Sequence, residues 1–339
     1  MSEDTSPILP KTDREARRGS REGHYGLKAF MVGLSVVAVA IVCLVVYAVP
    51  LPQHRGGVVP QVVLTPNPVI AVLSLPSSTE PHADETIESS YIKWIESAGG
   101  RAMRIPFHAS NDDIAALLCA ANGVLLPGGT DDVPPAAAAF IFNHILALHE
   151  NESHVPLWAT GRAMSWLLQL KSGNNSILDV VNATNMSSVL AFPNGLIRGS
   201  RMFGYSPVFD VMEAETAARS LEDGGIYPRH MAASPSLASF FKPLATAIDR
   251  QGQKYVAAIE GIDNPIYGVH FHPEKNAYDF GHGSVDHSAN AILSSQALAH
   301  FFVGEARRNN HRFDPTTTHT VQWLDYDGEL RFNASTTHR

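Results

Sequence analysis

Cysteine is almost missing from this chain, whose 339 residues contain only two. Cys43 lies within a long apolar run and Cys119 lies in a segment of helical periodicity, so no framework of disulfide bonds can hold the fold together. A small disulfide-stapled domain is therefore excluded. The fold must rest on a hydrophobic core, and 45% apolar with 17% charged residues suits one sizeable globular domain with appendages.

Positive charge is also scarce. Lysine and arginine total 25 against 33 aspartates and glutamates, which leaves a net charge of −8 at pH 7 with neutral histidine. Proteins that bind nucleic acid carry basic surfaces that attract phosphate. We therefore predict no nucleic-acid partner, and the sequence predicts neither a cofactor nor a metal site.

Charged residues are absent from one stretch, AFMVGLSVVAVAIVCLVVYAV, at 29–49. A helix needs about 20 apolar residues to cross a bilayer. We predict an uncleaved signal-anchor, because the 28 residues before this stretch exceed the short leader of a cleaved signal peptide. Small residues near Ala48 keep cleavage, and hence a secreted or lumenal form, as the alternative.

The charges on the two sides of this span predict its orientation. The leader at 1–28 is basic, whereas Arg55 is the only lysine or arginine in the first 20 residues after the span. The N-terminus is thus expected in the cytoplasm. A Pro- and Gly-rich tether at 50–67 then leads to a lumenal or extracellular domain, in an endomembrane compartment, a vacuole or lysosome, or at the cell surface. Glycosylation acceptors agree with this topology and occur at Asn151, Asn174, Asn182, Asn185 and Asn333.

Strand-like apolar runs and stretches of helical periodicity alternate beyond the tether. We predict an α/β fold with a mostly parallel sheet flanked by helices on both faces, preceded by one transmembrane helix. The predicted strands lie at 68–75, 101–106, 123–129, in VPLWAT, at 254–261 and at 266–274. The predicted helices lie at 86–100, from Asn111, at 135–149, after Gly161 and at 291–310, and a hairpin is predicted around Asp327 and Gly328.

Ligands of such sheets bind at the C-terminal ends of strands, and three stretches there carry candidate chemistry. In PGGT, Gly128 and Gly129 allow backbone N–H groups to approach a ligand as an oxyanion hole requires, with an ordinary loop as the alternative. In HPE, His272 and Glu274 are expected on one side of an extended segment, as a general base and its orienting partner. A surface pair is the alternative there.

The third stretch is VPLWATGRAMSW at 155–166, where a buried strand runs directly into a helix. In many α/β hydrolases this turn, the nucleophile elbow, carries a reactive Ser or Cys. Here the turn residue is Gly161, which has no side chain to react.

These stretches resemble a known family in their order and spacing. YIKWIESAGG, GVLLPGGT, PLWATG, SRMF, YGVHFHPEK and FFVGEARRNNHRF come one after another as in the γ-glutamyl hydrolases. The resemblance covers roughly Pro68 to Phe313. It implies a domain at 68–313 with the class I glutamine amidotransferase-like fold, and a C-terminal tail at 314–339 after it.

The resemblance also implies a site. In this family a Cys on the elbow attacks the γ-glutamyl amide, a His activates it, a Glu orients the His, and a glycine pair supplies oxyanion donors. By position these roles fall to His272, Glu274, Gly128 and Gly129, whereas the nucleophile position holds Gly161.

The elbow departs from the family pattern on both sides of Gly161. The family typically reads Gly-Thr-Cys-Leu-Gly, and this chain reads Ala159-Thr160-Gly161-Arg162-Ala163. Glycine adopts the strained backbone angles of an elbow readily, so we expect the turn to survive while the thiol chemistry is lost. Arg162 is expected either to pair with a substrate carboxylate or to extend to the surface from the helix start.

Three further polar residues bear on the implied site. A further family histidine resembles His230 in YPRHMAASP, for which a plain loop histidine is the alternative. The hydroxyls of Thr160 and Ser165 are not expected to replace the thiol.

The resemblance implies a γ-glutamyl hydrolase-like protein, related to enzymes that trim folate poly-γ-glutamates. With the apolar stretch at 29–49 and glycine at the nucleophile position, we predict a membrane-anchored pseudo-hydrolase. Its expected ligand is a γ-glutamyl or folate-like small molecule, and its expected assembly is a homodimer or a pair with an active relative. The alternative is an active folylpolyglutamate hydrolase that uses water or a non-standard nucleophile.

Overall fold

The computed structural model describes residues 64–77, 85–193, 199–215, 217–281, 285–312, 323–324 and 330–332. The predicted leader, the predicted anchor at 29–49 and most of the tether lie outside these residues, as does Asn333. Within the described ranges, no helix combines the length and apolar character that a membrane crossing needs. The membrane anchor therefore stays a prediction.

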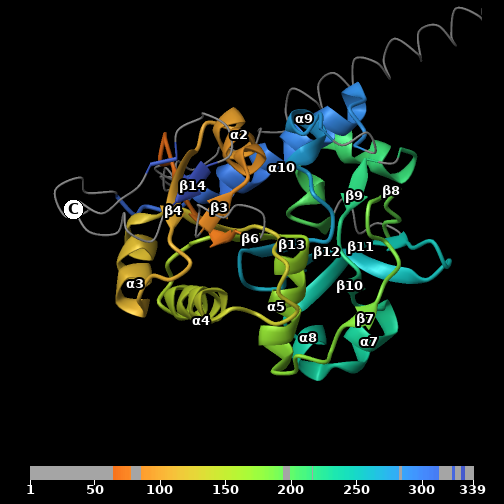
Figure 1. Cartoon of the computed structure of the whole chain (residues 1–339), viewed down its shortest axis with the longest axis horizontal. Helices are drawn as coiled ribbons and strands as arrows, with labels where there is room; N and C mark the ends of the chain where they lie inside the picture. The colour runs from red at the N-terminus through yellow and green to blue at the C-terminus, as the bar shows by residue number, and fades with distance from the viewer. Residues whose placement is uncertain are drawn as a thin grey trace, which may run out of the picture. The chain divides into compact units, whose positions relative to one another are not determined.

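A seven-stranded sheet runs through the described domain (Figure 1). Its strands have the order β4 (Arg101–Ile105), β1 (Val69–Leu73), β5 (Gly123–Leu126), β6 (Leu157–Thr160), β13 (Ile266–Val269), β12 (Lys254–Gly261) and β11 (Phe241–Ile248). The strands from β4 to β13 are parallel, and β12 and β11 add an antiparallel edge. The predicted α/β fold with a mostly parallel sheet is confirmed.

Helices cover both faces of this sheet, as the alternation along β1 shows. Ile70 and Val72 belong to one core, which also contains residues of α2 and α10. Ala71 and Leu73 belong to the other, with residues of α3, α4 and α5. Successive side chains of a strand point to opposite faces, so the two helix groups lie on opposite sides. These helices are α2 (Ser89–Ser97), α3 (Asn111–Ala120), α4 (Ala136–Glu150), α5 (Arg162–Ser172) and α10 (Ala289–Arg307).

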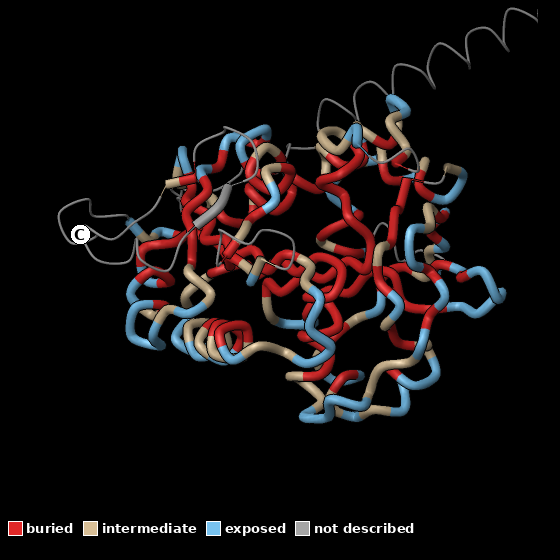
Figure 2. Tube along the Cα trace, viewed as in Figure 1, coloured by how far each residue is buried: buried red, intermediate tan, exposed pale blue. Residues whose placement is uncertain are grey.

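Burial reflects this layered arrangement. All residues of β1, β5, β6 and β13 are buried, and Figure 2 shows the buried positions gathered in the interior with exposed ones on the outer turns of the helices. Strands buried on both faces are typical of parallel sheets. The described domain thus has a central sheet with one hydrophobic core on each face.

Short ladders brace the loops at the C-terminal ends of the central strands. β7 (Asp179–Val180) pairs with β10 (Gly224–Gly225), and β8 (Met186–Ser188) pairs with β9 (Ala218–Ser220). The loop of residues 221–223 joins β9 to β10. The remaining short helices are η1 (Phe203–Tyr205), η2 (Pro207–Glu213), α7 (Pro228–Ala233), α8 (Pro235–Ala238) and α9 (Lys275–Tyr278).

One local prediction is wrong where distant strands pair. The helix predicted at 86–100 begins at Ser89, because β3 (Glu85–Ile87) pairs with β2 (Leu75–Pro76) and β14 (Leu330–Phe332). Pairing with a remote strand outweighs the local pattern at such positions. Most residues of the hairpin predicted around Asp327 and Gly328 lie outside the described ranges, so that hairpin stays a prediction.

The strand predicted at 266–274 ends at Val269. His272 and Glu274 lie in a turn before α9, and Glu274 has helical angles of φ −63° and ψ −21°. The predicted extended geometry for this pair is therefore wrong. The chain leaves the sheet because it pairs with β9 instead, where the N–H of His272 donates to the carbonyl of Arg219 at 2.8 Å.

Candidate active site

Gly161 forms the junction between β6 and α5, with φ 57° and ψ −123°. Its N–H donates to the carbonyl of Val269 at 2.8 Å, which ties the elbow to β13. A positive φ is unfavourable for residues with a Cβ, so glycine holds this turn without strain. A Cβ here would lie 2.6 Å from His272 Nε2 and 3.0 Å from Glu222 Oε1. These two side chains occupy the space that a side chain on the elbow needs.

His272 and Glu274 form a buried pair beside the elbow. Nδ1 of His272 lies 2.8 Å from Oε1 of Glu274, and the two residues are 4% and 1% exposed. Burial lowers the pKa of His272, but the charge of Glu274 and the contacts with Glu222 and Glu274 outweigh it and raise the pKa to about 9. The imidazole is therefore protonated at neutral pH, and both of its nitrogens are donors.

Tyr91 on α2 connects this pair to the loop after β5. Its hydroxyl lies 3.3 Å from His272 Nδ1 and accepts a hydrogen bond from the N–H of Gly128 at 3.3 Å. Burial and the charge of Glu274 raise the pKa of Tyr91 well above its usual range, so the hydroxyl stays neutral. The N–H of Gly128 is thus directed at Tyr91, and its role as an oxyanion donor stays a prediction.

The glycine pair nevertheless lies at the site. A Cβ on Gly128 would lie 3.1 Å from His272 Cε1, and a Cβ on Gly129 would lie 2.9 Å from the ring of Trp166. A side chain at either position would force its neighbour to shift. Because β5, β6 and β13 are neighbours in the sheet, their C-terminal ends bring Gly128, Gly161 and His272 together.

Glu222 is a site residue that the sequence did not indicate. It comes from the loop between β9 and β10 and is 8% exposed. Its Oε2 lies 3.1 Å from Arg162 Nε, and its Oε1 lies 3.7 Å from His272 Nε2. Burial raises the pKa of Glu222, but the contacts with His272 and the charge of Arg162 lower it by more. The pKa is therefore below its usual value, and the side chain is a carboxylate. An acidic pair before Gly224 is an ordinary loop pattern, and no local signal distinguishes it.

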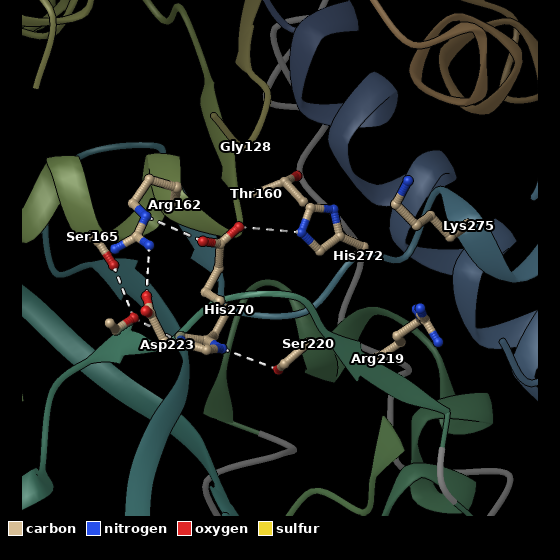
Figure 3. A network of polar contacts seen from close by, with 12 residues as sticks. Gly128, Thr160, Arg162, Ser165, Arg219, Ser220, Asp223, His270, His272 and Lys275 are labelled. Atoms are coloured by element: carbon tan, nitrogen blue, oxygen red, sulfur yellow. Dashed lines mark hydrogen bonds and ion pairs between the residues drawn. The ribbon is translucent and has the colours of Figure 1, made fainter. Parts of the chain in front are cut away.

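Arg162 is buried at the first turn of α5, with 8% exposure. Besides Glu222, its guanidinium contacts Asp223 Oδ1 at 2.8 Å and Asp132 Oδ1 at 3.5 Å. The absence of a side chain on Gly224 admits it, since a Cβ there would lie 2.6 Å from Nη1. The expected extension of Arg162 to the surface is therefore not observed. Figure 3 shows Arg162 and His272 reaching toward the same place from opposite sides.

The two hydroxyls next to the elbow are engaged elsewhere. The Thr160 hydroxyl accepts a hydrogen bond from the indole of Trp158 at 2.9 Å. Ser165 donates to the carbonyl of Gly224 at 3.3 Å. Among the described residues, the side-chain hydrogen-bond partners of His272 are Tyr91 and Glu274, and neither hydroxyl is among them.

His230 contacts Asp179 and Arg229 and not His272 in the bonds that the structure describes. It is exposed on α7, where its Nδ1 lies 2.7 Å from Asp179 Oδ1 and its Nε2 lies 3.2 Å from Arg229 Nε. His230 is therefore a helix residue at the surface, and its role in substrate binding stays a prediction.

Comparisons with known proteins agree with this geometry. Residues 68–150 match the Peptidase C26 family. The chain is 31% identical to gamma-glutamyl hydrolase B of Dictyostelium discoideum over 258 residues, which cover 73% of this chain and 74% of that protein. It is 33% identical to the gamma-glutamyl hydrolase of Mus musculus over 245 residues, 70% of this chain and 76% of that protein.

Among solved structures, the glutaminase domain of Trypanosoma brucei CTPS with bound acivicin is similar over 73% of this chain and 97% of that chain, with a TM-score of 0.48 and 12% identity. The sequence relatives are far more similar, and they decide the family. The chain belongs to the γ-glutamyl hydrolase family.

Proposed function

We propose that this protein is a membrane-anchored γ-glutamyl hydrolase-like pseudo-hydrolase, which keeps the fold and the His–Glu pair of its family without the thiol mechanism. One observation carries the proposal. Gly161 holds the elbow at φ 57°, with no side chain to attack a carbonyl, while His272 and Glu274 remain hydrogen-bonded at 2.8 Å beside it. The machinery that activates a nucleophile faces a position without one.

In the part of the chain that the structure describes, no group near His272 supports a substitute nucleophile. The hydroxyls of Thr160 and Ser165 are bonded to other partners. Cys119 is exposed on α3, and its thiol is not among the contacts of His272. Loss of the nucleophile in a comparable serine protease lowers turnover about a millionfold. We therefore expect no acyl-enzyme to form.

Hydrolysis through water is the rival function, and the charges of the site argue against it. A general base must accept a proton, but a His272 with a pKa of about 9 already carries it at neutral pH. The Glu222 carboxylate also lies 3.7 Å from His272 Nε2, on the side where an attacking water has to stand. Both features favour the pseudo-hydrolase.

The ligand, the topology and the assembly belong to the same proposal. The relatives are named gamma-glutamyl hydrolases, which supports a γ-glutamyl or folate-like small molecule as the ligand class. The apolar stretch at 29–49 supports a single-pass anchor with a lumenal or extracellular domain. A homodimer, or a pair with an active relative, is the assembly we propose.

A turnover assay tests the proposal. The full-length chain would be incubated with a γ-linked glutamate peptide beside a His272→Ala variant and, as the positive control, the Mus musculus gamma-glutamyl hydrolase. We expect the native chain and the variant to release glutamate at the same background rate. Clear turnover by the native chain that disappears in His272→Ala would overturn the proposal and establish the water-based hydrolase.

A further inference from the structure

The Glu222 carboxylate lies where a side chain on the elbow would begin. Its Oε1 is 3.0 Å from the place of a Cβ on Gly161 and 3.5 Å from the place of a Cβ on Gly128. Two positions without side chains therefore frame the carboxylate. A surface glutamate that turned inward without a structural cause would not be expected to lie next to two positions that both lack a side chain.

The loop that carries Glu222 is fastened at both ends. Before it, β9 pairs with the chain at Phe271, and the carbonyl of Arg219 accepts from the N–H of His272 at 2.8 Å. After it, the carbonyl of Asp223 accepts from the N–H of Val181 at 2.7 Å, and β10 pairs with β7. These backbone bonds fix the loop relative to the His272 turn, so the position of Glu222 is a property of the fold.

Two cationic side chains next to Glu222 form a binding site for its carboxylate. Arg162 Nε lies 3.1 Å from Oε2, and His272 Nε2 lies 3.7 Å from Oε1. The distance to His272 is that of an ion pair and not of a hydrogen bond, and Nε2 has no hydrogen-bond partner in the described part of the chain. Two buried cationic groups thus converge on one carboxylate. Each cation also has a carboxylate partner of its own, Glu274 for His272 and Asp223 for Arg162, and Glu222 is the carboxylate that both share.

We propose that Glu222 is an internal ligand of this site: its carboxylate fills the reactive position between Arg162 and His272, and its removal opens a binding site for a small carboxylate such as acetate. The proposal rests on the pseudo-hydrolase function and deepens it by naming the occupant of the site. It also gives a reason for glycine at the elbow, because any larger residue competes with Glu222 and His272 for the same space.

Acetate is chosen as the probe because its size matches the part of the Glu222 side chain that alanine lacks. Replacing Glu222 by alanine removes a CH₂–COO⁻ group, and acetate restores nearly the same atoms. Replacing it by glutamine keeps the volume and removes the charge. Asp223→Ala removes the exposed partner of Arg162 while Glu222 stays in place. These three variants separate an opened carboxylate site from a general response to salt.

The experiment measures melting temperatures of the full-length chain in sodium acetate and in sodium chloride of equal ionic strength. We expect Glu222→Ala to melt below the native chain in chloride and to gain about 3 to 6 °C when acetate is about tenfold above its dissociation constant. The native chain, Glu222→Gln and Asp223→Ala should show no difference between the two salts. If Glu222→Ala does not fold in chloride, refolding in acetate alone supports the proposal in the same way.

Two outcomes would overturn the proposal: acetate leaves Glu222→Ala unchanged relative to chloride, or it stabilises all four proteins equally. Neither outcome bears on turnover, and a native chain that hydrolyses γ-glutamyl peptides refutes the proposed function without this assay. Failure of the internal-ligand proposal and failure of the pseudo-hydrolase proposal are therefore distinguishable.

An introduced thiol supplies an independent measurement. Gly161→Cys alone places a side chain against Glu222 and His272, whereas Gly161→Cys with Glu222→Ala leaves the thiol beside a cationic imidazole, which lowers a thiol pKa. At pH 6 we expect iodoacetamide to alkylate the double variant at least about tenfold faster than the single one, with the native chain as the background for its own cysteines. Equal rates would show that Glu222 does not occupy the position.

Discussion

At the scale of single residues, Gly161 decides both the geometry and the chemistry of the site. Its backbone adopts φ 57°, which side-chain-bearing residues rarely take, and a Cβ would come within 2.6 Å of His272. Glycine is therefore favoured at this position for two reasons: the positive φ and the lack of space for a side chain. At Gly173, at the other end of α5, only the positive φ of 65° favours glycine, because nothing lies within 4 Å of the place of a Cβ.

This pair of glycines yields a matched prediction. Gly173→Ala should lower the free energy of unfolding by about 1 kcal/mol, the cost of a left-handed residue with a Cβ. Gly161→Ala should lower it by about 2 to 4 kcal/mol, because overpacking against His272 adds to the backbone strain. Urea denaturation of both variants measures the difference. Equal losses would show that the elbow has room for a side chain.

At the scale of elements, the site includes two segments that lie outside the regular strands and helices: the turn after β13, which carries His272, and the loop after β9, which carries Glu222. Neither is a regular strand or helix at the residues that matter, yet backbone hydrogen bonds join them at Arg219 and His272. The sequence indicated His272 and Glu274 because a short motif holds both residues. It did not indicate Glu222, whose partners Arg162 and His272 lie far along the chain and become neighbours through tertiary contacts such as the bridge between β9 and Phe271.

The turn after β13 makes stability depend on pH. The folded pKa of His272, about 9, lies above its ordinary value of 6.5, so the stabilisation is complete below about pH 6.5 and is lost as the pH rises to about 9. The slope reaches about 1.4 kcal/mol per pH unit at most. The neighbouring groups change their charge in other pH ranges. The pKa values of Glu222 and His270 are lowered, and those of Lys275 and Tyr91 are raised.

Unfolding by urea at several pH values checks this expectation. The native chain should lose stability between about pH 6.5 and 9 relative to His272→Gln, which has no proton to release. Parallel curves for the two proteins would mean that His272 is not charged in the fold.

At the scale of the whole molecule, the described domain has two hydrophobic cores, one on each face of the sheet, and four of the five predicted glycosylation acceptors lie among the described residues, outside both cores. Asn151, Asn174, Asn182 and Asn185 are all exposed. An acceptor must be accessible to carry a glycan, so the surface agrees with the proposed lumenal or extracellular topology.

Expression in a eukaryotic host tests that topology. The full-length chain should lose mass on treatment with an N-glycosidase, and a variant with all five acceptor asparagines changed to glutamine should not. A native chain that enters membranes but shows no glycosidase shift would contradict a lumenal or extracellular domain.

Short-range pattern was enough to predict the alternation of strands and helices, the elbow at Gly161, and the pair His272 and Glu274. Each of these depends on periodicity along one segment or on a motif of a few residues. The inward turn of Arg162, the pairing of β3 with β14, and the seat of Glu222 at the elbow emerged only from the folded arrangement. These features require segments remote in the chain to meet. Local propensity carries no information about which remote segment supplies the partner for a buried charge.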